Sequence, residues 1–213
     1  MALFDKKINN LFVAWLSVSL LLVFSIIIVG GLTRLTNSGL SITEWELIEG
    51  ILPPLNEQTW ISYFDLYKQI PQFQILNPNM SLDEFKIIFY WEYFHRILAR
   101  IIGIFFLLPL IYFHITKKIK KKYLLICYFI FSLIVVQGIV GWYMVKSGLV
   151  NVVTVSHFRL SIHLLMAFII ISTLFWLLIN FKKTTYKNFF NFDKKNIPYL
   201  FLFLIIILQI ILG

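Results

Sequence analysis

Long apolar runs, separated by short polar stretches, dominate this chain. Five of these runs are long enough to cross a lipid bilayer or nearly so: residues 11–33, 87–115, 124–145, 158–181 and 198–213. A helix of about 20 predominantly apolar residues crosses the hydrocarbon core of a bilayer. The pattern therefore predicts an all-α, polytopic membrane helix bundle, with one four-helix half and the start of a fifth span.

Composition and charge agree with this fold class and exclude others. The chain is 60% hydrophobic, contains 22 Phe and has a mean hydropathy of +0.85, values that exclude an ordinary soluble domain. The net charge is +9, but the basic residues lie in short runs between apolar segments, which argues against nucleic-acid binding. With Cys127 as the single cysteine, disulfides and thiolate metal sites within one chain are excluded.

The distribution of lysines predicts the orientation. The loops 116–123 and 182–197, together with Lys6 and Lys7, hold 12 of the 19 basic residues. Because basic loops stay on the cytoplasmic side, we expect a cytoplasmic N-terminus and an external segment 34–86. The first apolar run is too long for a signal-peptide core, and no Arg/Ser-rich transit peptide precedes it. These features favour a bacterial inner membrane over a mitochondrion.

We divide the chain into a transmembrane half, 1–181, and a cytoplasmic loop with the fifth span, 182–213. The outer segment 34–86 belongs to the first part and is rich in aromatic residues such as Trp60 and Tyr67. Such a density is typical of interfacial anchoring, of a lid over a hydrophobic ligand site, or of an amphipathic hairpin on the membrane surface. The pattern leaves these alternatives open.

Glycines mark two further positions. Gly30 and Gly31, followed by Asn37, suit a tight turn where the chain leaves the membrane. Gly138 and Gly141 in the third span would allow close approach of a neighbouring helix or a flat ligand.

An unusual charged cluster lies inside the second apolar run, at residues 91–100. Charged side chains near the bilayer centre cost roughly 2.5 to 3.5 kcal/mol each on insertion scales, so they usually mark a site. Helical spacing places Glu92, His95 and Arg96 on one face, with Glu92 and Arg96 close enough to pair. The alternative is a structural ion pair that reaches toward the interface.

A second histidine, His163, lies at a depth similar to that of His95 in another span. Two imidazoles at one depth on neighbouring helices can bind a haem iron from its two faces. Basic groups near the outer interface suit haem propionates; they are Arg34, Arg96, Arg100 and Arg159. Packed, hydrogen-bonded histidines remain the alternative, and we expect neither His114 nor His157 to bind iron.

Several segments together resemble the haem A synthases, which convert haem O to haem A for terminal oxidases. They are GGLTRLTNSGLSITEW (30–45), PPL (53–55), EFK (84–86), WEYFHR (91–96), QGIVGWYMVKSGL (137–149) and RLSIHL (159–164). The resemblance covers nearly the whole chain and is to the proteobacterial and mitochondrial form. A different bacterial form has a cysteine pair in the first outer loop, which this chain lacks.

The resemblance implies eight helices in two related halves, each with histidines on its second and fourth helices. Glu92 matches the acid of the Glu-x-x-His motif, and His95 and His163 match the iron ligands of the first half, which is implied to bind haem O as substrate. The implied oxidoreductase reaction turns a ring methyl into a formyl group through successive hydroxylations, with oxygen from water. We hypothesise that Glu92 accepts a proton from that water or orients it. Implied partners are a haem O synthase and the cytochrome oxidase assembly machinery.

The resemblance implies a second half that holds a haem b. Because the chain ends at Gly213, we expect either a truncated form or a half-size protein, with the haem b ligands beyond the chain. Such a chain would be inactive alone, or would need a partner chain or a second copy in a homo-oligomer. Two rival functions are a bis-histidine membrane cytochrome for electron transfer and a cofactor-free membrane assembly protein.

Overall fold

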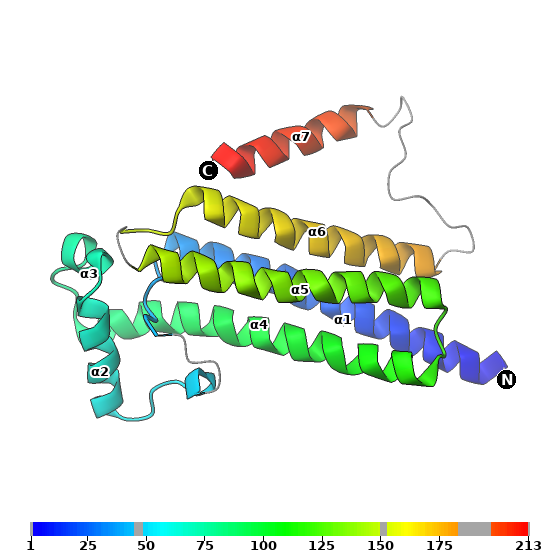
Figure 1. The fold of residues 1–213 in the computed structure, drawn as a ribbon, viewed down its shortest axis with the longest axis horizontal. Helices are drawn as coiled ribbons and strands as arrows, with labels where there is room; N and C mark the ends of the chain where they lie inside the picture. The colour runs from blue at the N-terminus through cyan, green and yellow to red at the C-terminus, as the bar shows by residue number, and fades with distance from the viewer. Residues whose placement is uncertain (1, 45–48, 150–152, 183–196, 213) are drawn as a thin grey trace. The chain divides into compact units, whose positions relative to one another are not determined.

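The computed structural model describes residues 2–44, 49–149, 153–182 and 197–212, and these ranges contain helices and no strand (Figure 1). The elements, in chain order, are α1 (Ala2–Leu35), η1 (Glu49–Ile51), α2 (Glu57–Lys68), α3 (Pro71–Leu76), α4 (Leu82–Thr116), α5 (Lys121–Gly148), α6 (His157–Lys182) and α7 (Ile197–Leu212). Helices α1, α4, α5 and α6 are long and apolar enough to cross a membrane. The prediction of an all-α, polytopic membrane protein is confirmed.

The last element, α7, is a shorter apolar helix of 16 residues. It contacts α6 through the Ser161 hydroxyl, which donates a hydrogen bond of 2.6 Å to the carbonyl oxygen of Ile210. Most of its side chains are exposed. The predicted cytoplasmic lysines Lys183, Lys187, Lys194 and Lys195, like Trp45 of the outer segment, lie outside the described residues.

The turn predicted from Gly30, Gly31, Asn37 and Ser38 is confirmed at Asn37 and Ser38 but not at the glycines, because α1 continues through both glycines to Leu35. Backbone groups inside a membrane span have to be satisfied within the helix, so a glycine pair does not end it there. The turn follows instead at residues 36–40, where Asn37 adopts a left-handed conformation with φ of 52°. Asparagine tolerates this region better than most residues.

The chain divides into two compact units. The first comprises Met1–Phe24, Ile101–Gln137 and Ser161–Gly213, and its core is aromatic. Phe12 is fully buried and packs against Trp15, Phe113 and Phe181, with ring centroids 4.6 to 5.6 Å apart. The Trp15 indole N–H donates to the carbonyl oxygen of Phe105 at 3.3 Å, so parts of α1, α4 and α6 share one packed interior.

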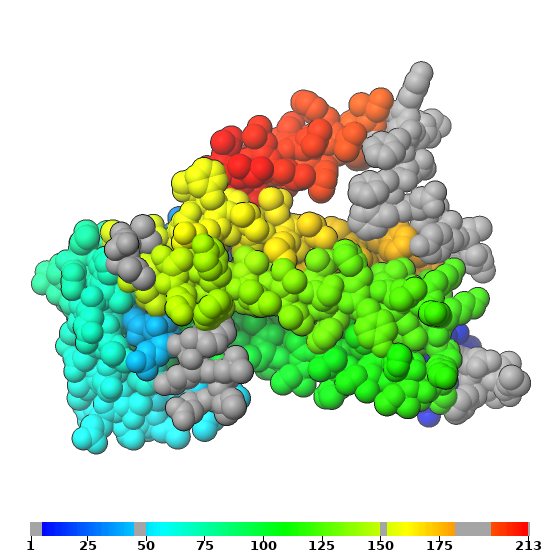
Figure 2. All heavy atoms as spheres, viewed as in Figure 1, coloured from blue at the N-terminus to red at the C-terminus, as the bar shows by residue number. Residues whose placement is uncertain are grey.

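The second unit comprises Ser25–Arg100 and Gly138–Leu160 and contains the outer segment. Its helix α2 begins at the cap residue Asn56, whose side chain accepts a hydrogen bond from the Thr59 amide at 2.8 Å. Trp60, Phe64 and Tyr67 follow at helical spacing and are buried on one face of α2. Figure 2 shows the cyan and turquoise side chains of α2 and α3 as a continuous packed surface.

These aromatic side chains form a hydrophobic core of their own. The buried members of this core are Leu40, Ile42, Trp60, Phe64, Tyr67, Ile70, Phe85, Ile88 and Phe89. Phe85 and Phe89 come from the first turns of α4, which begins with a reciprocal capping arrangement between Ser81 and Glu84 at 2.8 to 3.3 Å. None of the alternatives predicted from the sequence included interior packing, which is the role that the structure gives Trp60, Phe64 and Tyr67.

A chain of hydrogen bonds crosses this core. The Asn77 amide donates to the Tyr67 hydroxyl at 2.8 Å, Tyr67 donates to Gln72 at 3.2 Å, and Gln72 donates to the Asn37 carbonyl oxygen at 3.0 Å. Burial, and secondarily the negative charge of Glu92, raises the pKa of Tyr67, although the Asn77 contact opposes this. The phenol therefore stays protonated and remains a donor to Gln72.

We predict that Gln72→Ala destabilises the outer segment. Gln72 is 1% exposed, and its loss leaves both the Tyr67 hydroxyl and the Asn37 carbonyl oxygen without this partner. An unsatisfied buried polar group costs about 1 to 3 kcal/mol, so the thermal unfolding midpoint in detergent should fall. Gln58→Ala, at an exposed position of α2, is the matched control. Equal midpoints for the two variants would contradict the prediction.

Candidate functional site

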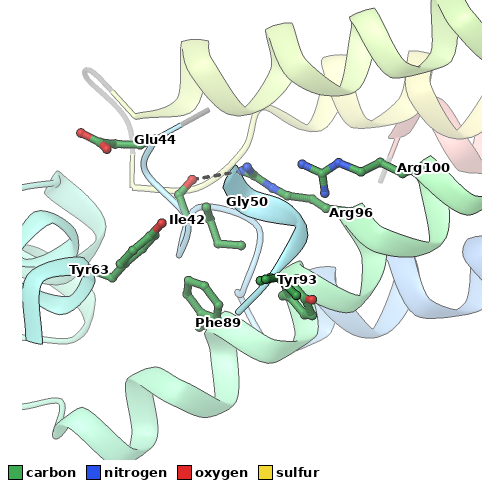
Figure 3. A pocket seen from close by; sticks show the side chains of 9 residues that line it. Ile42, Glu44, Gly50, Tyr63, Phe89, Tyr93, Arg96 and Arg100 are labelled. Carbon is green, nitrogen blue, oxygen red and sulfur yellow. Dashed lines mark hydrogen bonds between the residues drawn. The ribbon is translucent and has the colours of Figure 1, made fainter. Parts of the chain in front are cut away.

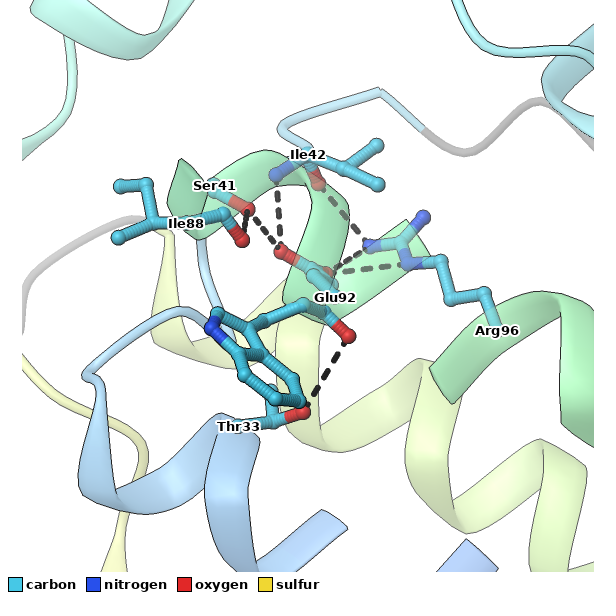
Figure 4. Close-up of polar contacts among 7 residues, drawn as sticks. Thr33, Ser41, Ile42, Ile88, Glu92 and Arg96 are labelled. Atoms are coloured by element: carbon cyan, nitrogen blue, oxygen red, sulfur yellow. Dashed lines mark hydrogen bonds and ion pairs between the residues drawn. The ribbon is translucent and has the colours of Figure 1, made fainter. Parts of the chain in front are cut away.

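Glu92 lies in α4 and is only 3% exposed. One carboxylate oxygen, Oε2, accepts hydrogen bonds from the Ser41 hydroxyl at 2.8 Å and from the Ile42 amide at 2.9 Å (Figure 4). The other, Oε1, accepts two from Arg96, at 3.0 Å from Nε and 2.5 Å from Nη2. A carboxylate offers about four lone-pair positions, and this one accepts four hydrogen bonds.

Arg96 completes the same network from the other side. Its Nη2 also donates to the Ile42 carbonyl oxygen at 3.0 Å, so Ile42 is held at both its amide and its carbonyl. The predicted pairing of Glu92 with Arg96 is confirmed, and the side chains are 3% and 12% exposed. The pair therefore holds the segment that follows α1 against α4.

His95 occupies the turn of α4 between these two charged residues and is half-buried. A Cβ built on Gly30 would lie 3.2 Å from Nε2 of His95, so the imidazole rests against the bare backbone of α1. In the described part of the chain, the ring makes no hydrogen bond. Gly30, which is not part of the turn, thus leaves space for His95, the predicted iron ligand.

The other predicted iron ligand, His163, lies half-buried near the start of α6. Its backbone carbonyl oxygen accepts a hydrogen bond of 2.9 Å from the Gln137 amide of α5, in the first compact unit. His95 belongs to the second unit. Joint binding of one iron by the two histidines therefore stays a prediction.

Two of the four predicted arginines lie together. Arg96 and Arg100 line a cavity of about 20 Å³, shared with Ile42, Tyr63 and Tyr93 among others (Figure 3). A space of this volume holds about one water molecule. It is bordered by Arg96 and Arg100, by Tyr63 and Tyr93 and by the acidic Glu44, a mixed set of groups that suits a water.

The other two arginines have different surroundings. Arg34 is exposed in the last turn of α1. Arg159 donates to the Ser147 hydroxyl and lies over the Tyr143 ring, 5.2 Å from its centroid. These contacts connect α6 to the end of α5 within the second unit.

The two histidines that we predicted not to bind iron lie elsewhere. Nδ1 of His114 is 2.6 Å from the Tyr128 hydroxyl, near the end of α4. His157 is exposed at the first residue of α6, with its ring against Phe158. Whether either could bind iron stays untested by these contacts.

The His95 side chain has the chemistry of a haem ligand. Within the described ranges, no group of three or more His, Cys, Asp or Glu side chains could hold a metal. A haem brings its own ring nitrogens and needs only axial ligands such as neutral imidazole. The His95 ring, seated on glycine and without a hydrogen bond to the described residues, has the chemistry of such a ligand.

Sequence reasoning missed several residues that build this site. Ser41 and Ile42 supply half of the hydrogen bonds to Glu92. Thr33 donates to the Val29 carbonyl at 2.9 Å and lies 3.4 Å from that of Trp91, next to the charged cluster. The run of small polar residues from 33 to 41 was the available signal, but it does not reveal which partners they meet. In contrast, the structure gives Gly138 no close neighbour, since a Cβ there would contact nothing within 4 Å, so close approach at that glycine is not confirmed.

Comparison with known proteins points to one family. The profile of the COX15-CtaA family, described as cytochrome oxidase assembly protein, matches residues 13–213. The chain is 51% identical over 206 residues to a protein named Heme A synthase from Pelagibacter ubique, covering 95% of this chain and 60% of that protein. It is 43% identical over 209 residues to the protein of the same name from Flavobacterium psychrophilum, covering 97% and 61%.

A third relative, the Heme A synthase of Nitrosomonas eutropha, is 49% identical over 162 residues, which cover 76% of this chain and 46% of that protein. The chain therefore spans less than two thirds of the length of each of these three relatives. No solved structure matches the chain significantly.

We predict that Gly30→Ala displaces the His95 ring. The new methyl would lie 3.2 Å from Nε2, closer than ordinary packing allows, so the ring or α1 has to shift by a few tenths of an ångström. The thermal midpoint should fall, and the ¹⁵N resonances of the His95 ring should move. Gly31→Ala is the matched control, because nothing lies within 4 Å of its Cβ and alanine favours the helix by about 1 kcal/mol. If the thermal midpoint and the His95 ¹⁵N resonances change equally in the two variants, the contact between Gly30 and His95 is contradicted.

We predict that Glu92→Gln loosens the turn at residues 41–42. The substitution leaves the Arg96 guanidinium buried without its counter-charge, and breaking a buried pair in this way costs about 3 to 5 kcal/mol. Amide hydrogen exchange at Ile42 should accelerate. Asp83→Asn is the control, since the Asp83–Lys86 pair on the same helix is exposed and contributes little. Unchanged amide exchange at Ile42 in Glu92→Gln would contradict the inference that the Glu92–Arg96 pair holds this turn in place.

Proposed function

Because the chain belongs to the COX15-CtaA family of cytochrome oxidase assembly proteins, we propose that it forms the first half of a haem A synthase and binds haem O as substrate. The relatives named Heme A synthase, 43 to 51% identical to this chain, support the reaction class, an oxidoreductase. The observation that carries the proposal is the His95 imidazole, held against Gly30 one turn from a buried Glu92–Arg96 pair.

His95 and His163 are the proposed axial ligands of the haem iron. Both side chains are half-buried and lie in helices able to span a membrane. The close contact with Gly30 orients the His95 ring. A larger residue at position 30 of α1 would press against this ring. Glycine thus does for this imidazole what a hydrogen-bonding partner does in many haem proteins: it restricts the ring's orientation.

Arginines supply the proposed binding groups for the substrate's propionates. Arg96 and Arg100 border one cavity, so they are the two arginines proposed to bind the same propionate at its rim. Guanidiniums suit this role because they form charge-assisted, two-pronged hydrogen bonds. Arg34 and Arg159 are proposed as additional binding groups for the propionates or as support for the site.

Oxidation of a ring methyl to a formyl group with water as the oxygen source releases protons and electrons in equal number, and the electrons would pass to an acceptor outside the described residues. Haem O, when bound, would supply the methyl carbon that is oxidised. Glu92 is the proposed group that accepts a proton from the attacking water or orients it. Its four hydrogen bonds mean that one donor has to move before Glu92 can take a proton.

The chain is a multi-pass membrane protein, and we propose that it resides in a bacterial inner membrane. The lysine-rich loops support a cytoplasmic N-terminus. The family's description supports work with the cytochrome oxidase assembly machinery, and haem O as substrate implies supply by a haem O synthase. A homo-oligomer is a further proposal for which the described residues give no direct support.

We predict that the 213-residue chain, purified from cells that also make haem O, retains haem O or haem A. Reduced-minus-oxidised spectra and chromatography of the extracted haems measure this. His95→Ala and His163→Ala should each lose the bound haem, because each removes one proposed iron ligand. His114→Ala is the matched control, since this histidine contacts Tyr128 and should leave the haem in place.

The other outcomes separate the rival functions. Haem b alone, reversibly reduced, would favour an electron-transfer cytochrome. A folded chain without haem would contradict the substrate site and favour a cofactor-free assembly protein. Haem retained in both His95→Ala and His163→Ala would contradict the assignment of these two histidines as iron ligands.

A further inference from the structure

A short apolar loop in the second unit borders the cavity of Arg96 and Arg100, but its exposed side chains have no role in the site described above. It consists of residues 50–55, Gly-Ile-Leu-Pro-Pro-Leu, and is called the proline loop below. Ile51 is 46% exposed, Leu52 66% and Leu55 79%. Three large apolar side chains in one short loop form an exposed patch that soluble proteins usually avoid.

The proline loop lies against α4 at the level of the charged cluster. The Tyr93 hydroxyl donates a hydrogen bond of 2.7 Å to the carbonyl oxygen of Ile51. Leu52 lines the same cavity as Arg96 and Arg100. Since Arg100 follows Tyr93 by seven residues, or about 10 Å along the helix axis, the loop extends along α4 toward its middle.

The depth of this position follows from the length of α4. The helix ends at Thr116, next to Lys117 and Lys118, and about 20 residues cross the hydrocarbon core. Counting back from Thr116 therefore brings the other boundary of the core close to Arg96. Trp91, Tyr93 and Phe94 then form the aromatic belt expected at a membrane interface, and the proline loop lies at the same level.

Part of the backbone of the proline loop is suited to a low-dielectric environment. Non-helical backbone is costly there because N–H and C=O groups lack water. Pro53 and Pro54 have no N–H to satisfy, and the Ile51 carbonyl oxygen is satisfied by Tyr93. Phe94 is 57% exposed on α4 and is in ring contact with Tyr93, the residue that binds the loop.

We propose that the proline loop is inserted into the interfacial region of the lipid bilayer, with Leu52 and Leu55 against acyl chains. The loop then covers the cavity that contains Arg96 and Arg100 and separates these guanidiniums from lipid. This assignment does not depend on the haem reaction, because it rests on the loop's exposure, composition and position along α4.

The test attaches a fluorophore at single positions of the whole 213-residue chain in phosphatidylcholine vesicles. The variants Leu52→Cys and Leu55→Cys are labelled with the environment-sensitive NBD group. Ser62→Cys, at an exposed polar position of α2, is the matched control. The unmodified chain measures background labelling at Cys127, which is fully buried.

We expect lipids carrying a doxyl group to quench NBD at positions 52 and 55 while iodide in the water does not. Position 62 should show the reverse, and its emission should lie at longer wavelength. Quenching by iodide alone at 52 and 55 would overturn the proposal, because it would place the loop in water. Quenching by neither agent would overturn it as well, because it would mean that protein, such as a second copy of the chain, covers the loop. Retained helical circular dichroism in each variant excludes unfolding as the cause.

Discussion

The buried ion pair of Glu92 and Arg96 is the interaction on which the second unit depends. Taking two charges out of water costs several kcal/mol per ion, and the mutual attraction offsets this only when the remaining hydrogen-bonding positions are also satisfied. Here the backbone and side chain of residues 41–42 satisfy them. The ion pair depends on the hydrogen bonds that the turn supplies. The turn has little regular structure of its own and is held in place by the ion pair. Neither would hold this geometry without the other.

This dependence extends to the rest of the outer segment. Leu40 and Ile42, on either side of the clamped Ser41, are buried in the aromatic core with Trp60 and Phe89. The Gln72 contact to Asn37 fixes the same turn from the α3 side. The aromatic core therefore covers the turn, while the ion pair anchors it from inside α4. Together they hold one end of α1 in contact with α4, where Gly30 meets His95.

What could be predicted from the sequence was the part governed by local periodicity. The spanning helices follow from apolar runs, and the Glu92–Arg96 pair follows from a spacing of four residues on one helix. The contacts of Ser41 and Gly30 join residues more than 50 positions apart, and no periodic pattern encodes them. The glycine pair shows the limit clearly. Glycine is compatible both with a turn and with close helix packing, and only the partner, His95, decides between them.

The same hydrogen bonds constrain how Glu92 could handle a proton. All four lone-pair positions of its carboxylate are used, and three of the donors, the Ile42 amide and the two nitrogens of Arg96, cannot become acceptors. The Ser41 hydroxyl differs, because it can both donate and accept, and the carbonyl oxygen of Ile88 lies 3.3 Å away as a second acceptor. If the hydroxyl hydrogen of Ser41 turns to the Ile88 carbonyl oxygen, the Ser41 oxygen can accept a hydrogen bond from a protonated Glu92. The contact between Ser41 and Glu92 is then kept. A serine at position 41 thus reconciles the structural role of this carboxylate with its proposed proton-accepting role, which an alanine there would not do.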